Sequence, residues 1–138
     1  MNSTTLTVAN ALKTVVSASF NSVGFMTGGT PEQAAAGKPL PKGIRPPCVL
    51  ILAGDGICTD STLTRRQTFH LVLLDELKGT DDARTTAAWT RLDALLAMFP
   101  PEGTQSGETI FLPESFRLME CGDARAAACL TVTAATPA

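Results

Sequence analysis

The chain has 138 residues and a formal net charge of -2, with 11 Lys and Arg against 13 Asp and Glu. Hydrophobic residues make up 44% and charged residues 17%, which excludes an intrinsically disordered chain and a basic nucleic-acid-binding protein. This length favours a single domain over residues 1–138, with a core large enough that no disulfide or metal is needed for stability.

The N-terminal sequence MNSTTLTVAN lacks a basic segment and a long apolar segment, and no run approaches the roughly 20 apolar residues that cross a bilayer. We therefore expect no membrane contact and synthesis in the cytoplasm. The four cysteines, Cys48, Cys58, Cys121 and Cys129, show no C-x-x-C spacing, and His70 is the single histidine. We expect free thiols and neither a metal nor a cofactor.

The first predicted element is a helix over Thr5 to Phe20. Val8, Leu12 and Val15 recur at helical spacing, which indicates one buried face. Segment 21–47 follows with five Gly and five Pro, a density that excludes a long helix or a central strand.

Within this segment, Thr30 offers an N-cap hydroxyl, Pro31 stands at the first helical position and Gln33 at the third. This pattern predicts one short helix over Pro31 to Ala36 inside an otherwise long loop.

Loops of this length in compact domains are commonly functional. This one carries Phe25 and Met26, which we expect to be exposed, beside the basic Lys38, Lys42 and Arg45. We interpret the whole loop as an extended interaction arm, and these five residues as candidates for a subunit or partner interface.

Two strands are predicted next, over Cys48 to Ala53 and over Arg66 to Leu77. The second is apolar on both faces near its middle, so we expect it to be central in the sheet. Between the two, Asp55-Gly56 predicts a tight turn, because glycine accepts the positive φ that such turns need.

The clearest helix is predicted over Asp81 to Phe99, with Ala88, Leu92 and Leu95 on its apolar face and a proline pair after it. Three short strands are expected after this helix: Glu108 to Leu112, Ser115 to Cys121 and Ala126 to Thr133. The last two are joined by a hairpin turn at Gly122-Asp123, and the tail ATPA is expected to fray.

These elements predict an α+β fold: a mainly antiparallel sheet of about four to five strands, two principal helices packed on one face, and the long Gly/Pro-rich loop.

Residues 49–61, VLILAGDGICTDS, resemble the D-x-D-G-T-x-x-D-S signature of haloacid-dehalogenase phosphatases. In that signature the first aspartate attacks phosphorus, and here Ala53 occupies its position. An alanine forms no phospho-enzyme and binds no magnesium, so a strand and a turn explain the segment better. An unusual hydrolase using Asp55 and Asp60 stays an alternative.

Other catalytic pairings are disfavoured. A base at His70 would need an open pocket, whereas a central strand indicates a structural histidine. Strand termination at Asp75-Glu76 and capping at Asp81-Asp82 already account for those paired carboxylates. We therefore expect no enzymatic activity.

Four further arginines are candidates for an interface: Arg65 and Arg66 at the start of the long strand, and Arg84 and Arg91 on the polar face of the second long helix. They could meet acidic neighbours in an oligomer or face water.

The order and length of the elements resemble the small tail-terminator (tail-completion or neck) proteins of long-tailed bacteriophages. The segments that carry this resemblance are, in order, TLTVANALKTVVSASF, IRPPCVLILAG, RRQTFHLVLLDEL, TDDARTTAAWTRLDALLAMFP and SFRLMECGDARAAACLTVT. Together they cover nearly the whole chain.

The resemblance implies a non-enzymatic virion protein, assembled in the host cytoplasm. Six copies would form a ring that caps the tail tube and docks to the head connector, and genome DNA would pass through the lumen without sequence-specific binding. Two alternatives stay open: another phage neck or head-completion protein, and a small non-viral adaptor or ligand-binding module.

Overall fold

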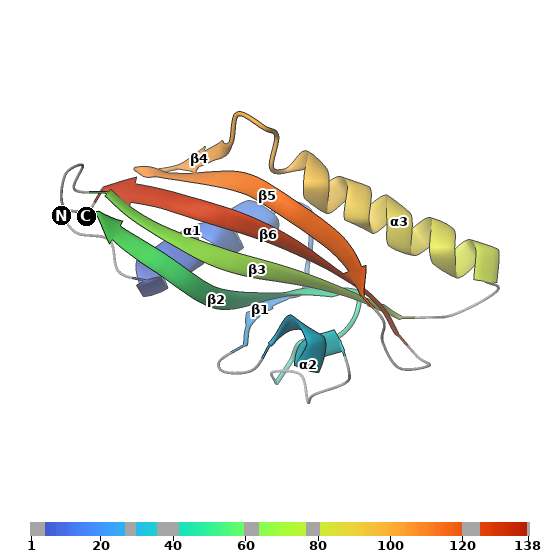
Figure 1. Cartoon of the computed structure of the whole chain (residues 1–138). Helices are drawn as coiled ribbons and strands as arrows, with labels where there is room; N and C mark the ends of the chain where they lie inside the picture. The colour runs from blue at the N-terminus through green and yellow to red at the C-terminus, as the bar shows by residue number, and fades with distance from the viewer. Residues whose placement is uncertain are drawn as a thin grey trace.

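A strongly twisted sheet organises the molecule (Figure 1). The structure, a computed structural model, describes residues 5–26, 30–35, 42–59, 64–76, 81–119 and 125–137. Within these residues the elements are, in chain order, α1 (Thr5–Val16), β1 (Val23–Phe25), α2 (Pro31–Ala35), β2 (Cys48–Thr59), β3 (Thr64–Glu76), α3 (Asp81–Ala97), β4 (Thr104–Ser106), β5 (Thr109–Met119) and β6 (Arg125–Pro137).

The six described strands form one sheet in the order β1-β2-β3-β6-β5-β4. Only β1 and β2 are parallel, and the other neighbours are antiparallel. The mixed α+β prediction is therefore confirmed, with six strands in place of the four to five expected. The two additional strands, β1 and β4, have three residues each and carry little local sequence signal.

The central position predicted for the long strand is also confirmed, because β3 pairs with β2 on one side and with β6 on the other. Successive side chains of a strand point to opposite faces. Leu71 and Leu73 join the core beneath α1 and α3, whereas Val72 and Leu74 join a second core beneath α2. Both faces of β3 are thus covered.

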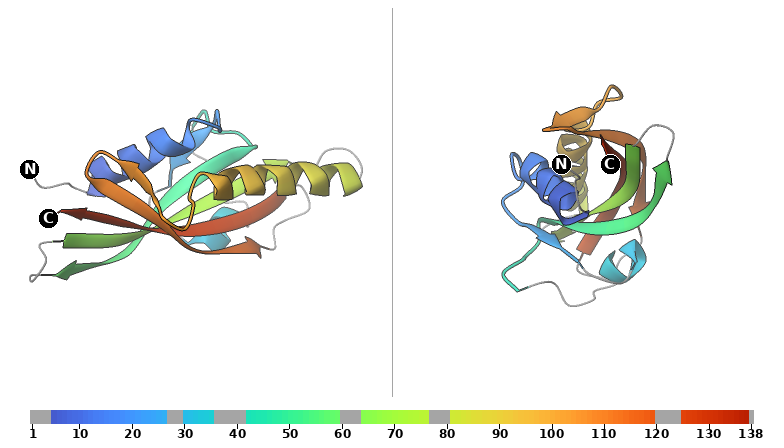
Figure 2. Two further views of the ribbon diagram at one scale, coloured as in Figure 1. Left: turned by 90° about the horizontal axis from the view of Figure 1, so that it is seen from above. Right: turned by 90° about the vertical axis from the view of Figure 1, so that its left-hand side faces the viewer.

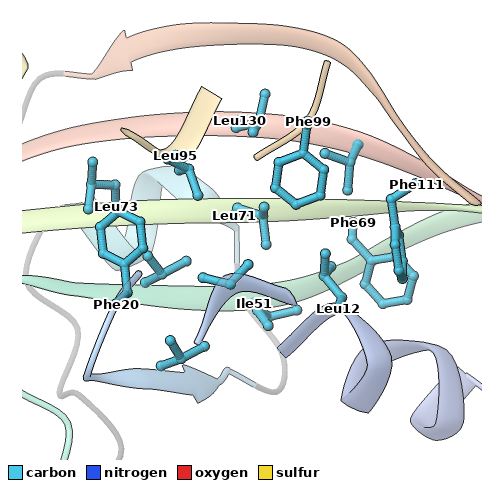
Figure 3. Packing of buried hydrophobic residues seen from close by; sticks show 14 of the residues in the cluster. Leu12, Phe20, Ile51, Phe69, Leu71, Leu73, Leu95, Phe99, Phe111 and Leu130 are labelled. Atoms are coloured by element: carbon cyan, nitrogen blue, oxygen red, sulfur yellow. The ribbon is translucent and has the colours of Figure 1, made fainter. Parts of the chain in front are cut away.

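The sheet curls around α1 and α3, which share its inner face, and α2 covers part of the outer face (Figure 2). Figure 3 shows Leu12 of α1 and Leu95 of α3 gathered over the same face as Leu71 and Leu130 of the sheet. Burying each such leucine contributes roughly 1.5–3 kcal/mol. The predicted placement of both principal helices on one face is confirmed.

Both long helices end earlier than their apolar patterns predicted. After Val16 the chain tightens, and the amide of Ser19 donates to the carbonyl of Val16 at 3.2 Å. After Ala97, the amide of Phe99 donates to the carbonyl of Leu96 at 3.1 Å. Such bonds between residues three apart close the last turn of a helix, and they still bring Phe20 and Phe99 into the core.

The predicted turn at Asp55-Gly56 is wrong, because both residues lie within β2, which continues to Thr59. The register against β3 shifts between Ala53 and Gly56, so the strand has a bulge there. The glycine has a packing reason instead: a Cβ at Gly56 would lie 2.7 Å from the carbonyl oxygen of Arg66. The connection between β2 and β3 lies outside the described residues.

The predicted loop 21–47 contains a strand, β1, which pairs with residues 49–51 of β2. The short helix α2 is confirmed over Pro31–Ala35, whereas Ala36 lies outside the described residues. Its capping is reciprocal: the amide of Gln33 donates to Thr30 Oγ1 at 3.2 Å, and the amide of Thr30 donates to Gln33 Oε1 at 3.0 Å.

The last strands differ from the prediction in two ways. The segments 108–112 and 115–121 belong largely to one strand, β5, which has an irregularity between Pro113 and Ser115. The expected fraying of the tail ATPA is wrong for residues 135–137, because β6 pairs with β3 up to Pro137 and Thr136 is buried, while Ala138 lies outside the described residues. The predicted hairpin turn at Gly122-Asp123 lies outside the described residues.

Candidate functional site

The C-terminal half of β5 forms an outer edge of the sheet. β4 covers only residues 109–111, and within the part of the chain that the structure describes no strand pairs with the outer side of residues 115–119. An unpaired edge exposes backbone donors and acceptors to which another chain can bind. This half of β5 is therefore a candidate for a protein interface.

Two large apolar side chains stand on this edge. Phe116 is 54% exposed and Leu118 is 61% exposed. Their cross-strand partners on β6, Leu130 and Ala128, belong to the core beneath α3, so both exposed side chains lie on the α3 side of the sheet. They extend the apolar inner face beyond the part that the helices cover.

α3 adds a third exposed side chain, Trp89, which is 57% exposed. Asp93 follows one helical turn later on the same face and is also exposed. Arg91 lies on the opposite flank, where it binds Asp75 of β3. The flank that carries Trp89 thus faces away from β3, and α3 lies over the half of the sheet in which β5 ends (Figure 1).

We call Trp89, Asp93, Phe116 and Leu118 the β5 edge surface. Glu114, the extra residue at the irregularity of β5, is not part of it: the hydroxyl of Thr133, which lies on the outer face between the inner-face Val132 and Ala134, donates a hydrogen bond to Glu114 Oε1. The surface therefore combines three apolar side chains with one carboxylate. This combination suits a protein partner that carries cations around an apolar patch.

On the outer face of the sheet, an ion pair joins β5 to α2. Arg117 Nη2 donates a hydrogen bond to Glu32 Oε1. This hydrogen bond lowers the pKa of Glu32 and raises that of Arg117. Both side chains are more than half exposed, so solvent screens the pair and it contributes little to stability.

Three basic residues lie near β1, at the other edge of the sheet; we call Lys13, Lys42 and Arg45 the basic surface. Lys13 Nζ lies 5.2 Å from the centre of the Phe25 ring on β1, a cation–π distance. Lys42 and Arg45 are exposed, and the amide of Arg45 donates to Ser22 Oγ at 3.3 Å. The segment before β2 is thereby held beside β1.

The residues predicted for the interaction arm are only partly where we expected them. The expectation that Phe25 and Met26 are exposed is wrong, because both are half-buried, Phe25 against the core beneath α1 and Met26 against the core beneath α2. The pairing of β1 with β2 draws them in. Lys42 and Arg45 are exposed, and Lys38 lies outside the described residues.

The four arginines that we named as interface candidates have different surroundings in the structure. Arg65 donates to Thr5 Oγ1 and to Gln67 Oε1, the latter at 3.0 Å, so it ties the start of α1 to β3. Arg91 is engaged with Asp75, and Arg66 is exposed on β3. Arg84 lies in α3, and its side chain is outside those described.

The groups considered for catalysis have structural surroundings. His70 Nδ1 lies 3.1 Å from Thr131 Oγ1 across β3 and β6, within hydrogen-bonding distance. Cys48 and Cys129 are buried, and burial raises the pKa of the Cys129 thiol. Asp75 is buried and bound by Arg91, so it is not available as a general base.

One polar depression lies where β2 and β5 are irregular, and its volume is about 310 Å³. It is lined by Asp55, Gly56, Arg66, Gln67, Thr68, Glu114 and Thr133. Asp60 lies outside the described residues. Among the residues that the structure does describe, no three His, Cys, Asp or Glu side chains are placed to hold a metal ion.

Comparisons with known protein sequences assign the chain to no family. No protein-family model matches the chain, and a search of curated proteins gave no significant match. None of the described helices is long and apolar enough to cross a membrane.

Sequence reasoning missed Trp89, Phe116 and Leu118, the main apolar members of the β5 edge surface. The alternation Phe116-Arg117-Leu118 does predict a strand with one apolar face. Whether a helix covers that face depends on the position of α3. That position is set by contacts between segments far apart in the sequence, so the residues of β5 alone do not predict it.

Proposed function

We propose that the protein is a structural virion subunit of the tail-terminator kind. Copies assemble into a ring that caps the tail tube, bind the head connector and let genome DNA pass through the lumen. The proposal rests on one observation above all: the exposed apolar side chains Phe116 and Leu118 on the unpaired edge of β5, to which α3 adds the exposed Trp89.

An exposed edge of this kind favours assembly. Soluble monomers rarely expose large contiguous apolar patches. Burying each of these three side chains against a neighbour would contribute roughly 1.5–3 kcal/mol, which offsets part of the entropy cost of association. A ring subunit gains this contribution in every copy.

Passage of DNA fits the charge distribution. Affinity for nucleic acid comes mainly from clustered Lys and Arg side chains that neutralise phosphates. This chain is mildly acidic, and Arg65, Arg91 and Arg117 are engaged in bonds within the protein. A lumen built from such subunits would not retain a sliding polyanion.

The polar depression that contains Asp55 and Glu114 favours a second function, a small adaptor or ligand-binding module that acts as a monomer or dimer. Another phage neck or head-completion protein would use the same β5 edge surface, so it differs from the first proposal in partner alone.

Solution mass tests the proposal. Analytical ultracentrifugation from micromolar to millimolar protein, with negative-stain imaging of the largest species, is expected to show closed rings of about six copies, as cyclic symmetry allows. A monomer or dimer over the whole range would overturn the ring proposal and favour the adaptor.

A further inference from the structure

We propose that the β5 edge surface of one copy binds the basic surface of the next copy, head to tail. This inference rests on the proposed ring function and names the two surfaces that make its subunit contact. The occupant of the exposed edge is thus a second copy of the same chain.

The two surfaces have opposite charge. The β5 edge surface carries the exposed carboxylate Asp93, and the basic surface carries Lys13, Lys42 and Arg45. The two ion pairs found among the described residues, Arg91 with Asp75 and Arg117 with Glu32, use none of these four side chains. The unlike charges are available to meet across a contact between copies.

The two surfaces also lie toward opposite edges of the sheet. β5 is near one end of the strand order and β1 is at the other end. A contact between unlike surfaces is heterologous: it closes into a ring where the rotation between neighbouring copies is a whole fraction of a turn, and otherwise it builds an open filament. A contact between two β5 edges would instead oppose carboxylate to carboxylate, which is unfavourable.

The basic surface is suited to side-chain contacts, because the segment before β2 already shields β1. A Cβ at Gly24 would lie 2.9 Å from Ile44 Cγ1, so Ile44 packs directly on β1. The amide of Arg45 is held at Ser22. Lys42 and Arg45 are therefore carried on a segment that is anchored to the sheet, and their positions require little ordering upon contact.

Charge exchange between the surfaces gives the sharpest test. Lys42→Glu and Asp93→Lys are each expected to weaken self-association about two- to fivefold at low salt, the range for exposed charge pairs. Combining both substitutions is expected to recover most of the loss, because the opposite signs are restored with their positions exchanged. High salt should reduce the difference between wild type and single variants.

The apolar part of the contact has a matched control. Phe116→Thr keeps a residue that strands favour, removes the exposed ring, and is expected to weaken association more than about fivefold. Leu6→Gln removes a side chain of α1 that is 65% exposed and lies outside both surfaces, and it is expected to leave association unchanged. Circular dichroism and a thermal melt check that each variant is folded.

The outcomes separate the two proposals. If wild type forms rings and Phe116→Thr, Lys42→Glu and Asp93→Lys assemble equally well, the inferred contact is wrong while the ring function stands. If wild type itself remains monomeric, both fall. If Phe116→Thr does not fold, the charge exchange decides, and failure of the double variant to recover association overturns the inference.

Discussion

Arg91 Nη1 lies 2.7 Å from Asp75 Oδ2, and this ion pair joins the middle of α3 to the last part of β3. Asp75 is buried, whereas Arg91 is partly exposed. The pair therefore fixes how α3 is rotated on the sheet, with one flank toward β3 and the flank of Trp89 away from it. The position of the β5 edge surface depends on this rotation.

Removing the arginine should be costly for stability. Arg91→Ala leaves the buried Asp75 carboxylate without its ion-pair partner, and is expected to lower the free energy of unfolding by about 1–3 kcal/mol. Urea unfolding measures the change. Arg45→Ala, at an exposed position, is the matched control and should change stability by less than about 0.5 kcal/mol. Equal effects of both substitutions would contradict the structural role of the pair.

The contribution of α3 to the core can be tested with one substitution made at two sites. Leu95→Ala removes a fully buried side chain, and it is expected to cost about 2–5 kcal/mol because a cavity remains. Leu6→Ala on α1 removes the same atoms from a position that is mostly exposed, and should cost far less. Thermal unfolding of the two variants gives the comparison, and a similar loss at both would contradict the packing of α3.

The short helix α2 depends on its cap. Thr30→Ala removes the hydroxyl that accepts from the amide of Gln33, and is expected to cost about 0.5–2 kcal/mol. Thr30→Ser keeps the hydroxyl and should retain most of the stability. Hydrogen exchange of the amides of residues 32–35 measures the local effect, and unchanged protection in the alanine variant would show that the cap is dispensable.

The sequence predicted the elements with long, periodic apolar patterns and failed where pairing between distant segments decides. β3 and α3 were predictable because their apolar spacing alone specifies buried faces. No turn forms at Asp55-Gly56, because the pairing of β2 with β3 continues past these residues to Thr59. β1 was not predictable, since its three residues become a strand only when segment 49–51 lies beside them.

The candidate site follows the same rule. Lys42 and Arg45 could be named from the sequence, because charged residues beside prolines and glycines favour exposed segments. In the sequence, Phe116 and Leu118 show only the alternation of a strand whose apolar face is buried. Their exposure results from the short length of β4 and from the rotation of α3 about Arg91 and Asp75, both tertiary properties.

The bulge in β2 has a testable requirement for glycine. Gly56→Ala places a Cβ 2.7 Å from the carbonyl oxygen of Arg66, so the backbone of β2 or β3 must shift. Overpacking of this kind is expected to cost about 1–3 kcal/mol. Ala53→Ser, at an exposed position earlier in the same strand, is the control. If Gly56→Ala unfolds at the same urea concentration as wild type, the close approach of the two strands is wrong.

Cys129 should make stability fall at alkaline pH. Burial raises the pKa of its thiol in the folded protein, so the folded state keeps the proton at pH values where the unfolded chain has begun to lose it. The stabilisation is complete below the ordinary thiol pKa and is lost as the pH rises toward the raised value. Cys129→Ala is expected to flatten this part of the profile, measured as the unfolding free energy in urea from neutral pH into the alkaline range. An equally steep fall in the alanine variant would assign the alkaline sensitivity to other groups and contradict the burial of this thiol.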